Sequence, residues 1–248
     1  MKFTIALALL ITSQTVLAAP YYRFWRGSKL PQMPEQSYLA TMAKDFLPLA
    51  PKLFPHLQSY LVAVPATGLG VDEVALLAYT NEEDYVRGRA TAEGRAYGDA
   101  HWDIFERQNS VSLVPETLVG KLTSNKAYDL LKTDLNWGKG HTTFFIGKKK
   151  SSISTQQFST GLDAHVRTVR QGFVPMGLKG YVILVTEDRE YALMNWESEA
   201  KASKAFSTKF GNNVSTEASQ LMETLQWSPL TKFQNSIQRN KAYYVETK

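Results

Sequence analysis

Hydrophobic residues in the first half of the chain switch between a strand-like and a helix-like spacing. Strands are predicted over residues 21–27, 60–64, 74–79 and 111–118, which are aromatic or apolar runs bounded by turn residues. Between residues 38 and 49, apolar side chains recur every three or four positions, which predicts a helix that opens at Pro34 and is broken by Pro48. Asn81 is a favourable N-cap for a second helix that reaches about Ala96.

The second half of the chain follows the same order of elements. Strands are predicted over residues 142–147, 181–185, 191–196 and 230–233. Helices are predicted after an N-cap at Ser154 or Thr155, after an N-cap at Ser198, and over residues 215–225. Between the two halves, the pattern predicts a short helix over residues 126–131.

The two halves also resemble each other residue by residue. LQSYLVAV at 57–64 is similar to LKGYVILV at 178–185, and residues 74–83 are similar to residues 191–200. An offset of about 120 residues is too long for a solenoid repeat and close to the size of one compact domain. The order βαββαβ, found twice, predicts an α+β protein made of two ferredoxin-like repeats.

The predicted strands are apolar on both faces, so both faces of each sheet should be covered. We therefore expect the two repeats to pack sheet to sheet as an intramolecular pseudo-dimer, which forms a closed or nearly closed barrel and can hold a ligand between the sheets. The predicted organisation is a signal peptide (1–18), a first repeat (19–120), a connector (121–140), a second repeat (141–235) and a C-terminal tail (236–248).

The N-terminal residues predict export. Lys2 precedes a short apolar run over 5–11, and small residues up to Ala18 suit cleavage, with an uncleaved anchor as the alternative. A periplasmic or secreted protein is therefore expected, without integral membrane contact by the mature chain. The sequence contains no cysteine, which excludes thiol catalysis and cysteine-ligated metal sites. The net charge of +5 is mild, and the basic run at 148–150 is interpreted as a solvated turn, so no nucleic-acid partner is expected.

Several short motifs resemble the dimeric α+β barrel superfamily. PEQSY at 34–38, LPLAPKL at 47–53 and TAEGRA at 91–96 are similar to its EthD-like branch. NWESEA at 195–200 is similar to antibiotic-biosynthesis-monooxygenase-like domains. The resemblance implies a tandem duplication of the barrel unit, with cofactor-independent monooxygenase-like or isomerase-like activity on a small molecule.

The departures from this pattern limit what the resemblance implies for the site. EthD-like proteins commonly carry a histidine just before the Pro-Leu pair, where this chain has Phe46 and Leu47. The asparagine, tryptophan and histidine that surround the heme in heme-degrading members have no matching set here. No catalytic residue is therefore transferred from the family.

Histidine, arginine and aromatic side chains are the candidates for chemistry. His101 is the candidate general base or heme ligand, and a partly buried surface histidine is the alternative. His165 is a second candidate heme ligand. No two histidines have zinc-ligand spacing, so no metal site is predicted. The predicted ligand-binding residues are Arg23, Tyr60, Tyr79, Trp102, Tyr181 and Trp196, for which core packing or, for Arg23, a solvated strand end is the alternative.

The leading functional interpretation is an exported barrel protein that binds a small apolar or aromatic compound and requires no cofactor. A monomer is expected, because the duplication supplies both halves of the barrel. The first alternative is a non-catalytic binding or interaction module whose barrel is filled by side chains. Heme binding through His101 or His165 is a weaker alternative.

Overall fold

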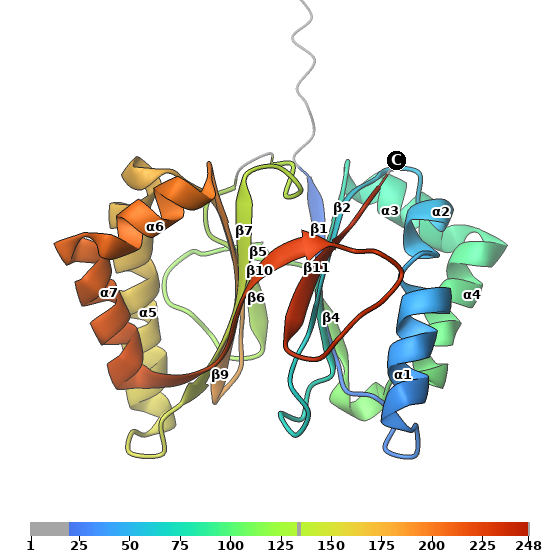
Figure 1. Cartoon of the computed structure of the whole chain (residues 1–248), viewed down its shortest axis with the longest axis horizontal. Helices are drawn as coiled ribbons and strands as arrows, with labels where there is room; N and C mark the ends of the chain where they lie inside the picture. The colour runs from blue at the N-terminus through green and yellow to red at the C-terminus, as the bar shows by residue number, and fades with distance from the viewer. Residues whose placement is uncertain (1–19, 133–134, 248) are drawn as a thin grey trace, which may run out of the picture.

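The structure, a computed structural model, describes residues 20–132 and 135–247. It is a mixed α+β protein in which eleven strands form one curled sheet and the helices cover its outside (Figure 1). The order of the strands in the sheet is β4-β1-β3-β2-β11-β10-β7-β9-β8-β6-β5. The predicted signal peptide over residues 1–18 lies outside the described residues.

The strands and helices have the following bounds. The strands are β1 (Tyr21–Gly27), β2 (Leu57–Val64), β3 (Glu73–Tyr79), β4 (Val111–Leu113), β5 (Glu116–Thr117), β6 (Lys126–Asp129), β7 (His141–Lys149), β8 (Leu178–Val185), β9 (Arg189–Trp196), β10 (Met222–Lys232) and β11 (Lys241–Val245). The helices are α1 (Glu35–Thr41), α2 (Ala50–Leu53), α3 (Glu82–Ala90), α4 (Ala92–Ala100), α5 (Thr155–Phe173), α6 (Glu199–Ser207) and α7 (Lys209–Leu221). Shorter turns are the π-helical η1 (Met42–Phe46) and the 3-10 turns η2 (His101–Asp103), η3 (Arg107–Asn109) and η4 (Val174–Met176).

Polar N-caps start the helices where the sequence predicts them. The Asn81 side chain accepts from the backbone N–H of Asp84 and starts α3. Ser154 and Gln157 form a reciprocal capping box at the start of α5. Ser198 caps α6 in the same way. These starts are readable from the sequence because a cap acts within a few residues of itself.

The sheet bends until its two ends come close together. β4 and β5 stand at opposite ends of the strand order, yet only residues 114–115 separate them along the chain. The link is too short to cross a flat sheet of eleven strands, because the three Cα–Cα steps from Leu113 to Glu116 span at most about 11 Å and neighbouring strands are about 4.8 Å apart. The sheet must therefore curl into a nearly closed barrel.

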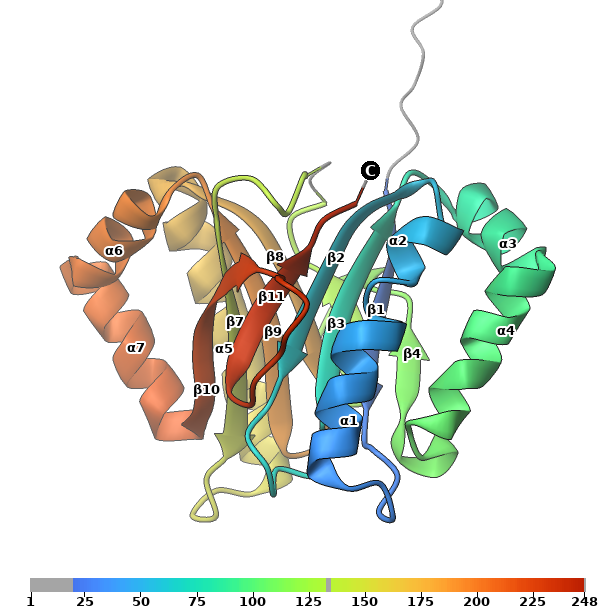
Figure 2. The same ribbon diagram turned by 45° about the vertical axis from the view of Figure 1, so that its right-hand side comes forward.

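A packed layer of apolar side chains fills the inside of this barrel. It combines Tyr22, Phe24 and Leu76 from one part of the sheet with Phe144 and Tyr191 from the other, and all of them are buried. α1 to α4 lie on one outer side and α5 to α7 on the other (Figures 1 and 2). Since side chains alternate along a strand, every second residue of β3 and β9 points outward, toward the helices.

The helix predicted from Asn81 to about Ala96 is divided at Thr91 into α3 and α4. Three further predictions, about the type of element, are wrong. The predicted helix over 126–131 is instead β6, which pairs antiparallel with β8. The predicted helix over 215–225 ends at Leu221, and the chain continues as β10 against β7. The predicted tail over 236–248 contains β11, which pairs antiparallel with β2 and parallel with β10. Each of these strands exists because of partners far away in the chain, which local spacing does not reveal.

Candidate functional site

Two cavities of about 320 Å³ each lie between the outer face of the sheet and its helices. The first cavity lies between β1, β2 and β3 and the segments η1, α3, α4 and η2. The second lies between β7, β8, β9 and β10 and the helices α5, α6 and α7. The expectation of a ligand space between the sheet faces is therefore corrected, because bulky residues such as Phe144 and Tyr191 pack that layer.

Five of the seven residues predicted for the site line the first cavity. These five are His101, Arg23, Tyr60, Tyr79 and Trp102. Tyr181 lines the second cavity.

Trp196 is fully buried and packs against Phe173 and Phe206, with ring centroids 5.2 and 5.7 Å away. The structure therefore gives Trp196 the core-packing role that the sequence left as its alternative.

Glu73 places a buried carboxyl group in the first cavity. It begins β3 and faces outward with Ala75 and Tyr79. Burial raises the pKa of the Glu73 carboxyl to about 8, and the indole N–H of Trp25 offsets part of that rise. Among the described residues, neither carboxyl oxygen has a partner at hydrogen-bonding geometry. Glu73 therefore keeps its proton at neutral pH.

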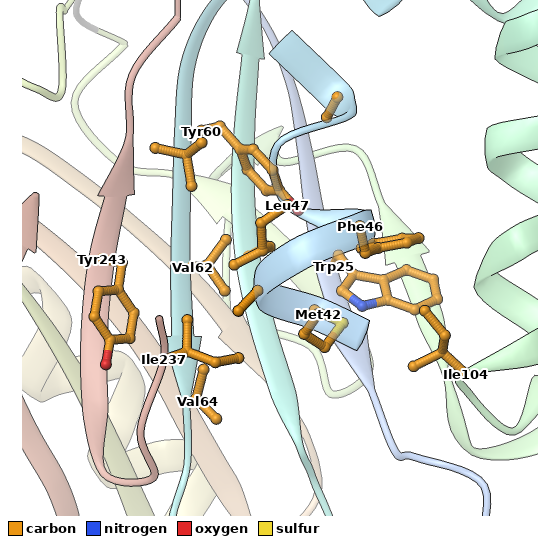
Figure 3. Packing of buried hydrophobic residues seen from close by; sticks show 14 of the residues in the cluster. Trp25, Met42, Phe46, Leu47, Tyr60, Val62, Val64, Ile104, Ile237 and Tyr243 are labelled. Carbon is orange, nitrogen blue, oxygen red and sulfur yellow. The ribbon is translucent and has the colours of Figure 1, made fainter. Parts of the chain in front are cut away.

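His101 lines the same cavity as Glu73. Its Nδ1–H donates to the carbonyl oxygen of Tyr97 at 2.9 Å, which leaves the lone pair on Nε2. Its ring packs against the rings of Phe46 and Trp25, with centroids 4.6 and 5.0 Å away. Figure 3 shows Phe46 and Trp25 close together on this side of the sheet. Burial lowers the pKa of His101 to about 4, so its imidazole is neutral at pH 7.

Tyrosine hydroxyls and two arginines complete the polar lining of the first cavity. The hydroxyls of Tyr60 and Tyr97 interact, and burial raises the pKa of both well above the usual value. Arg23 donates to the side chain of Ser112 at 2.8 Å, and its guanidinium carbon lies 5.3 Å from the Tyr85 ring centroid. Arg89 donates to the carbonyl of Gly94 at 2.7 Å. The first cavity thus combines aromatic walls, two cations and a neutral carboxyl group.

The second cavity also holds a buried carboxyl group and a histidine. The Tyr181 hydroxyl donates to Glu190 Oε1 at 3.1 Å, and burial raises the pKa of Glu190 to about 7. His165, on α5, has its Nδ1 buried without a hydrogen-bond partner in the described chain, 4.0 Å from Glu217. Burial lowers the pKa of His165 to about 4.

Sequence reasoning missed Glu73, Glu190 and Tyr97. Glu73 comes immediately before the predicted strand at 74–79, and Glu190 immediately before the predicted strand at 191–196. Extending the internal alignment by one residue places the same acidic residue at the same position of both halves. A carboxylate at the same repeat position, next to a buried run, is the signal that could have revealed the site.

The described part of the chain shows neither a metal-binding cluster nor a membrane-spanning helix. Within residues 20–132 and 135–247, no group of three or more His, Asp or Glu side chains is arranged to hold a metal ion. Over the same residues, no helix is both long enough and apolar enough to cross a bilayer.

No protein-family model matches the sequence, and no curated protein matches it. Similar solved structures include a proposed monooxygenase from Lactobacillus acidophilus NCFM, with 11% identity, coverage of 92% of this chain and 100% of that chain, and a TM-score of 0.42. A proposed monooxygenase from Fusobacterium nucleatum subsp. nucleatum has 10% identity, coverage of 85% and 94%, and a TM-score of 0.43. An anthrone oxidase-like protein has 10% identity, coverage of 85% and 92%, and a TM-score of 0.39. Similarities this low assign neither a family nor an activity to the chain.

Proposed function

We propose that this protein is a small-molecule-binding barrel of the dimeric α+β type, and that it arose by tandem duplication of an EthD-like unit. Two structural details shared by the halves support the duplication. The β2–β3 pairing has an irregularity between Leu57 and Ser59, and the β8–β9 pairing has one between Leu178 and Gly180, at the matching repeat position. Export to the periplasm or the cell exterior belongs to the same proposal and rests on residues 1–18.

The corner between the last two helices of each half gives further support. In the first half, Thr91 Oγ1 accepts from the N–H of Gly94 at 2.9 Å and donates to the carbonyl of Gly88 at 2.9 Å. In the second half, Thr208 Oγ1 accepts from the N–H of Gly211 at 3.0 Å and donates to a carbonyl at 2.7 Å. The same threonine, spaced three residues before a glycine, turns the chain between helices in both halves.

The first cavity is the proposed site, and a small aromatic carbonyl compound is the proposed ligand. Its volume of about 320 Å³ lies at the lower end of the range for small-molecule sites. Trp25, Trp102 and Tyr79 give it aromatic walls, and Arg23 and Arg89 favour an oxygen that carries negative charge. A neutral imidazole at His101 can accept a hydrogen bond from a ligand hydroxyl.

The observation that carries a catalytic role is the buried carboxyl of Glu73, which makes no hydrogen bond of good geometry among the described residues and is influenced by the indole N–H of Trp25. A general base works best when its pKa lies near the working pH, and burial places the pKa of Glu73 at about 8. In its ionised form, Glu73 takes a proton from a carbon next to the ligand carbonyl and leaves an enolate. Returning the proton to another carbon gives isomerisation, whereas oxidation of the enolate by molecular oxygen gives monooxygenase-type chemistry.

Proton exchange at carbon tests this function directly. The protein is incubated with 2-tetralone in D₂O, and loss of the proton next to the carbonyl is followed by NMR. We expect the native protein to accelerate exchange, with a rate that rises with pH around a midpoint near 8. Glu73→Gln should slow the catalysed exchange by about 100-fold or more.

Glu190→Gln is the matched control, because it makes the same change in the other cavity and should leave the rate unchanged. Equal rates for the native protein and Glu73→Gln would refute the catalytic role. If no ligand in a panel of aromatic ketones and quinones changed the fluorescence of Trp25 and Trp102, binding in this cavity would be refuted as well.

The alternative of a filled, non-catalytic barrel agrees with the packed inner layer but not with the first cavity, which contains His101 and two arginines.

Heme binding through His101 or His165 stays a prediction. A Soret shift on adding hemin that disappears in His101→Ala or His165→Ala would establish it.

A further inference from the structure

The two cavities have the same volume, but their linings differ in positive charge. Arg23 and Arg89 line the first cavity, whereas no Arg or Lys is found among the described residues that line the second. The polar groups of the second cavity include the Glu190 carboxyl, the His165 imidazole and the hydroxyls of Tyr181, Ser215, Ser219 and Thr224. Two chemically different cavities in one chain are suited to two different ligands.

Acceptor atoms without donors are the main feature of the second cavity. The Glu190 carboxyl is buried, and its one hydrogen bond among the described residues comes from the Tyr181 hydroxyl, on Oε1. The His165 side chain is only 8% exposed, and its Nδ1 has no hydrogen-bond partner in the described chain. A buried polar atom without a partner costs free energy, which a ligand that supplies a donor recovers.

The charge around these acceptors is negative or neutral on every side. Glu190 comes from β9, Tyr181 from β8 and His165 from α5, and Glu217 of α7 approaches His165 to 4.0 Å. β10 contributes Thr224 and α6 contributes Phe206, neither of which is charged. A cation that enters the cavity therefore meets the Glu190 carboxylate and, among the described lining residues, no positive charge.

Aromatic rings surround the same acceptors and favour a ligand that is both cationic and apolar. Trp227 is 45% exposed and lies edge-on to Phe145 and Phe206, with ring centroids 5.7 and 5.4 Å away. Aromatic faces attract ammonium groups and also pack against an aromatic ring of the ligand. Trp227 is thus both a wall of the cavity and a large apolar side chain partly open to solvent.

We propose that the second cavity is a separate binding site for a small aromatic amine, with its ammonium group held by Glu190 and His165 and its ring packed against Phe145, Phe206 and Trp227. This inference does not depend on the function proposed for the first cavity. The amine donates hydrogen bonds to the carboxylate and to an imidazole nitrogen, which are the acceptors that the protein leaves open.

Calorimetric titration with benzylamine and with benzoate tests the charge preference. The two probes have rings of the same size and opposite charge. We expect benzylamine to bind at pH 8 at least tenfold more tightly to the native protein than to Glu190→Gln. Benzoate binding should not change in that variant. Benzylamine should also quench the fluorescence of Trp227. Loss of this quenching in Trp227→Phe would place the ligand in the second cavity.

Control variants separate this site from the first cavity. Tyr181→Phe keeps the carboxylate and should retain benzylamine binding, and Glu73→Gln changes only the first cavity and should have no effect. Ala218→Phe fills the second cavity from α7 and should abolish binding even if the Glu190 variant were unstable. Unchanged benzylamine affinity in both Glu190→Gln and Ala218→Phe, or loss of affinity in Glu73→Gln alone, would overturn the proposal.

Discussion

At the scale of single residues, burial shifts carboxyl and imidazole groups in opposite directions. The pKa of Glu73 rises to about 8 and that of Glu190 to about 7, because the ionised carboxylate loses its hydration. The pKa of His101 and that of His165 fall to about 4 for the same reason, since there the protonated form is the charged one. At pH 7 the Glu73 carboxyl and both imidazoles are therefore mainly neutral, whereas the Glu190 carboxyl, with its pKa of about 7, is close to half ionised.

Glu73→Gln should make stability less sensitive to pH. The unfolded chain releases the Glu73 proton near the usual glutamate pKa of 4.5, whereas the folded protein keeps it until about pH 8. The native protein therefore loses stability as pH rises from about 4.5 to 8. The variant should be about 2–4 kcal/mol more stable than the native protein in urea unfolding at pH 8, and nearly equal to it at pH 4.5. A larger gain at the lower pH would contradict this account.

The histidines should limit stability on the acid side. The unfolded chain binds their protons near 6.5, but the folded protein binds them only near 4, so stability falls as pH decreases between these values. His165→Leu removes one of these groups together with its unpartnered Nδ1. We expect it to raise stability by about 1–2 kcal/mol at pH 5 relative to the native protein, measured by chemical unfolding. If the native protein were instead the more stable of the two at pH 5, His165 Nδ1 would have a hydrogen-bond partner in solution.

At the scale of elements, close backbone contacts and one partly buried ion cluster fix how helices and strands meet. A Cβ on Gly94 would lie 2.0 Å from the carbonyl oxygen of Gly88, and one on Gly211 would lie 2.2 Å from that of Ala205. These contacts explain why both helix corners use glycine. The Arg239 guanidinium, in the segment before β11, contacts Glu35 Oε1 at 2.6 Å and Asp72 Oδ1 at 2.7 Å.

Gly94→Ala should destabilise the protein, because the added methyl group forces α3 and α4 apart. We expect a loss of about 1–3 kcal/mol in urea unfolding. Gly211→Ala should give a loss of similar size if the two corners are equivalent. Ala92→Ser, an exposed change in the same turn, should cost less than about 0.5 kcal/mol. Clearly unequal losses at Gly94 and Gly211 would weaken the case for duplicated corners.

Arg239→Ala should loosen the C-terminal strand. The side chain of Arg239 is 14% exposed, and its removal leaves Asp72 partly buried without its cation. We expect a loss of about 2–3 kcal/mol and faster hydrogen exchange in β11. Lys232→Ala is the control, because it removes an exposed ion pair with Glu246 that contributes less than about 1 kcal/mol to the free energy of unfolding. Equal effects of the two variants would show that the cluster around Arg239 contributes little.

At the scale of the whole molecule, one continuous sheet joins both cavities. β11 lies between β2 and β10, and residues 114–115 join the two ends of the strand order. The packed inner layer draws side chains from both parts of the sheet. Unfolding one half would therefore expose apolar surface of the other, which makes independent unfolding of the halves costly.

We expect a single cooperative unfolding transition. Trp25 reports on the first cavity and Trp227 on the second, so single-tryptophan variants should unfold at the same urea concentration. Two separated midpoints would show that the halves are independent domains. Sedimentation of the same protein tests the predicted monomer, which stays a prediction.

The sequence alone determined the features that act within a few residues. The strands at 21–27 and 191–196, the caps at Asn81 and Ser198, and the repeated order of elements follow from side-chain spacing and local hydrogen bonds. Five of the predicted site residues line one cavity, but that cavity lies on the outer face of the sheet, whereas the sequence analysis expected a ligand between the sheet faces.

Only the tertiary structure decided where the free space lies and which polar groups it leaves without partners. β6 and β11 depend on strands far away in the chain, and whether Trp196 packs or lines a pocket depends on α5 and α6. The pKa values of Glu73 and Glu190 depend on the helices that exclude water from them. Burial is a property of the assembled fold, so the chemistry that burial creates is decided there.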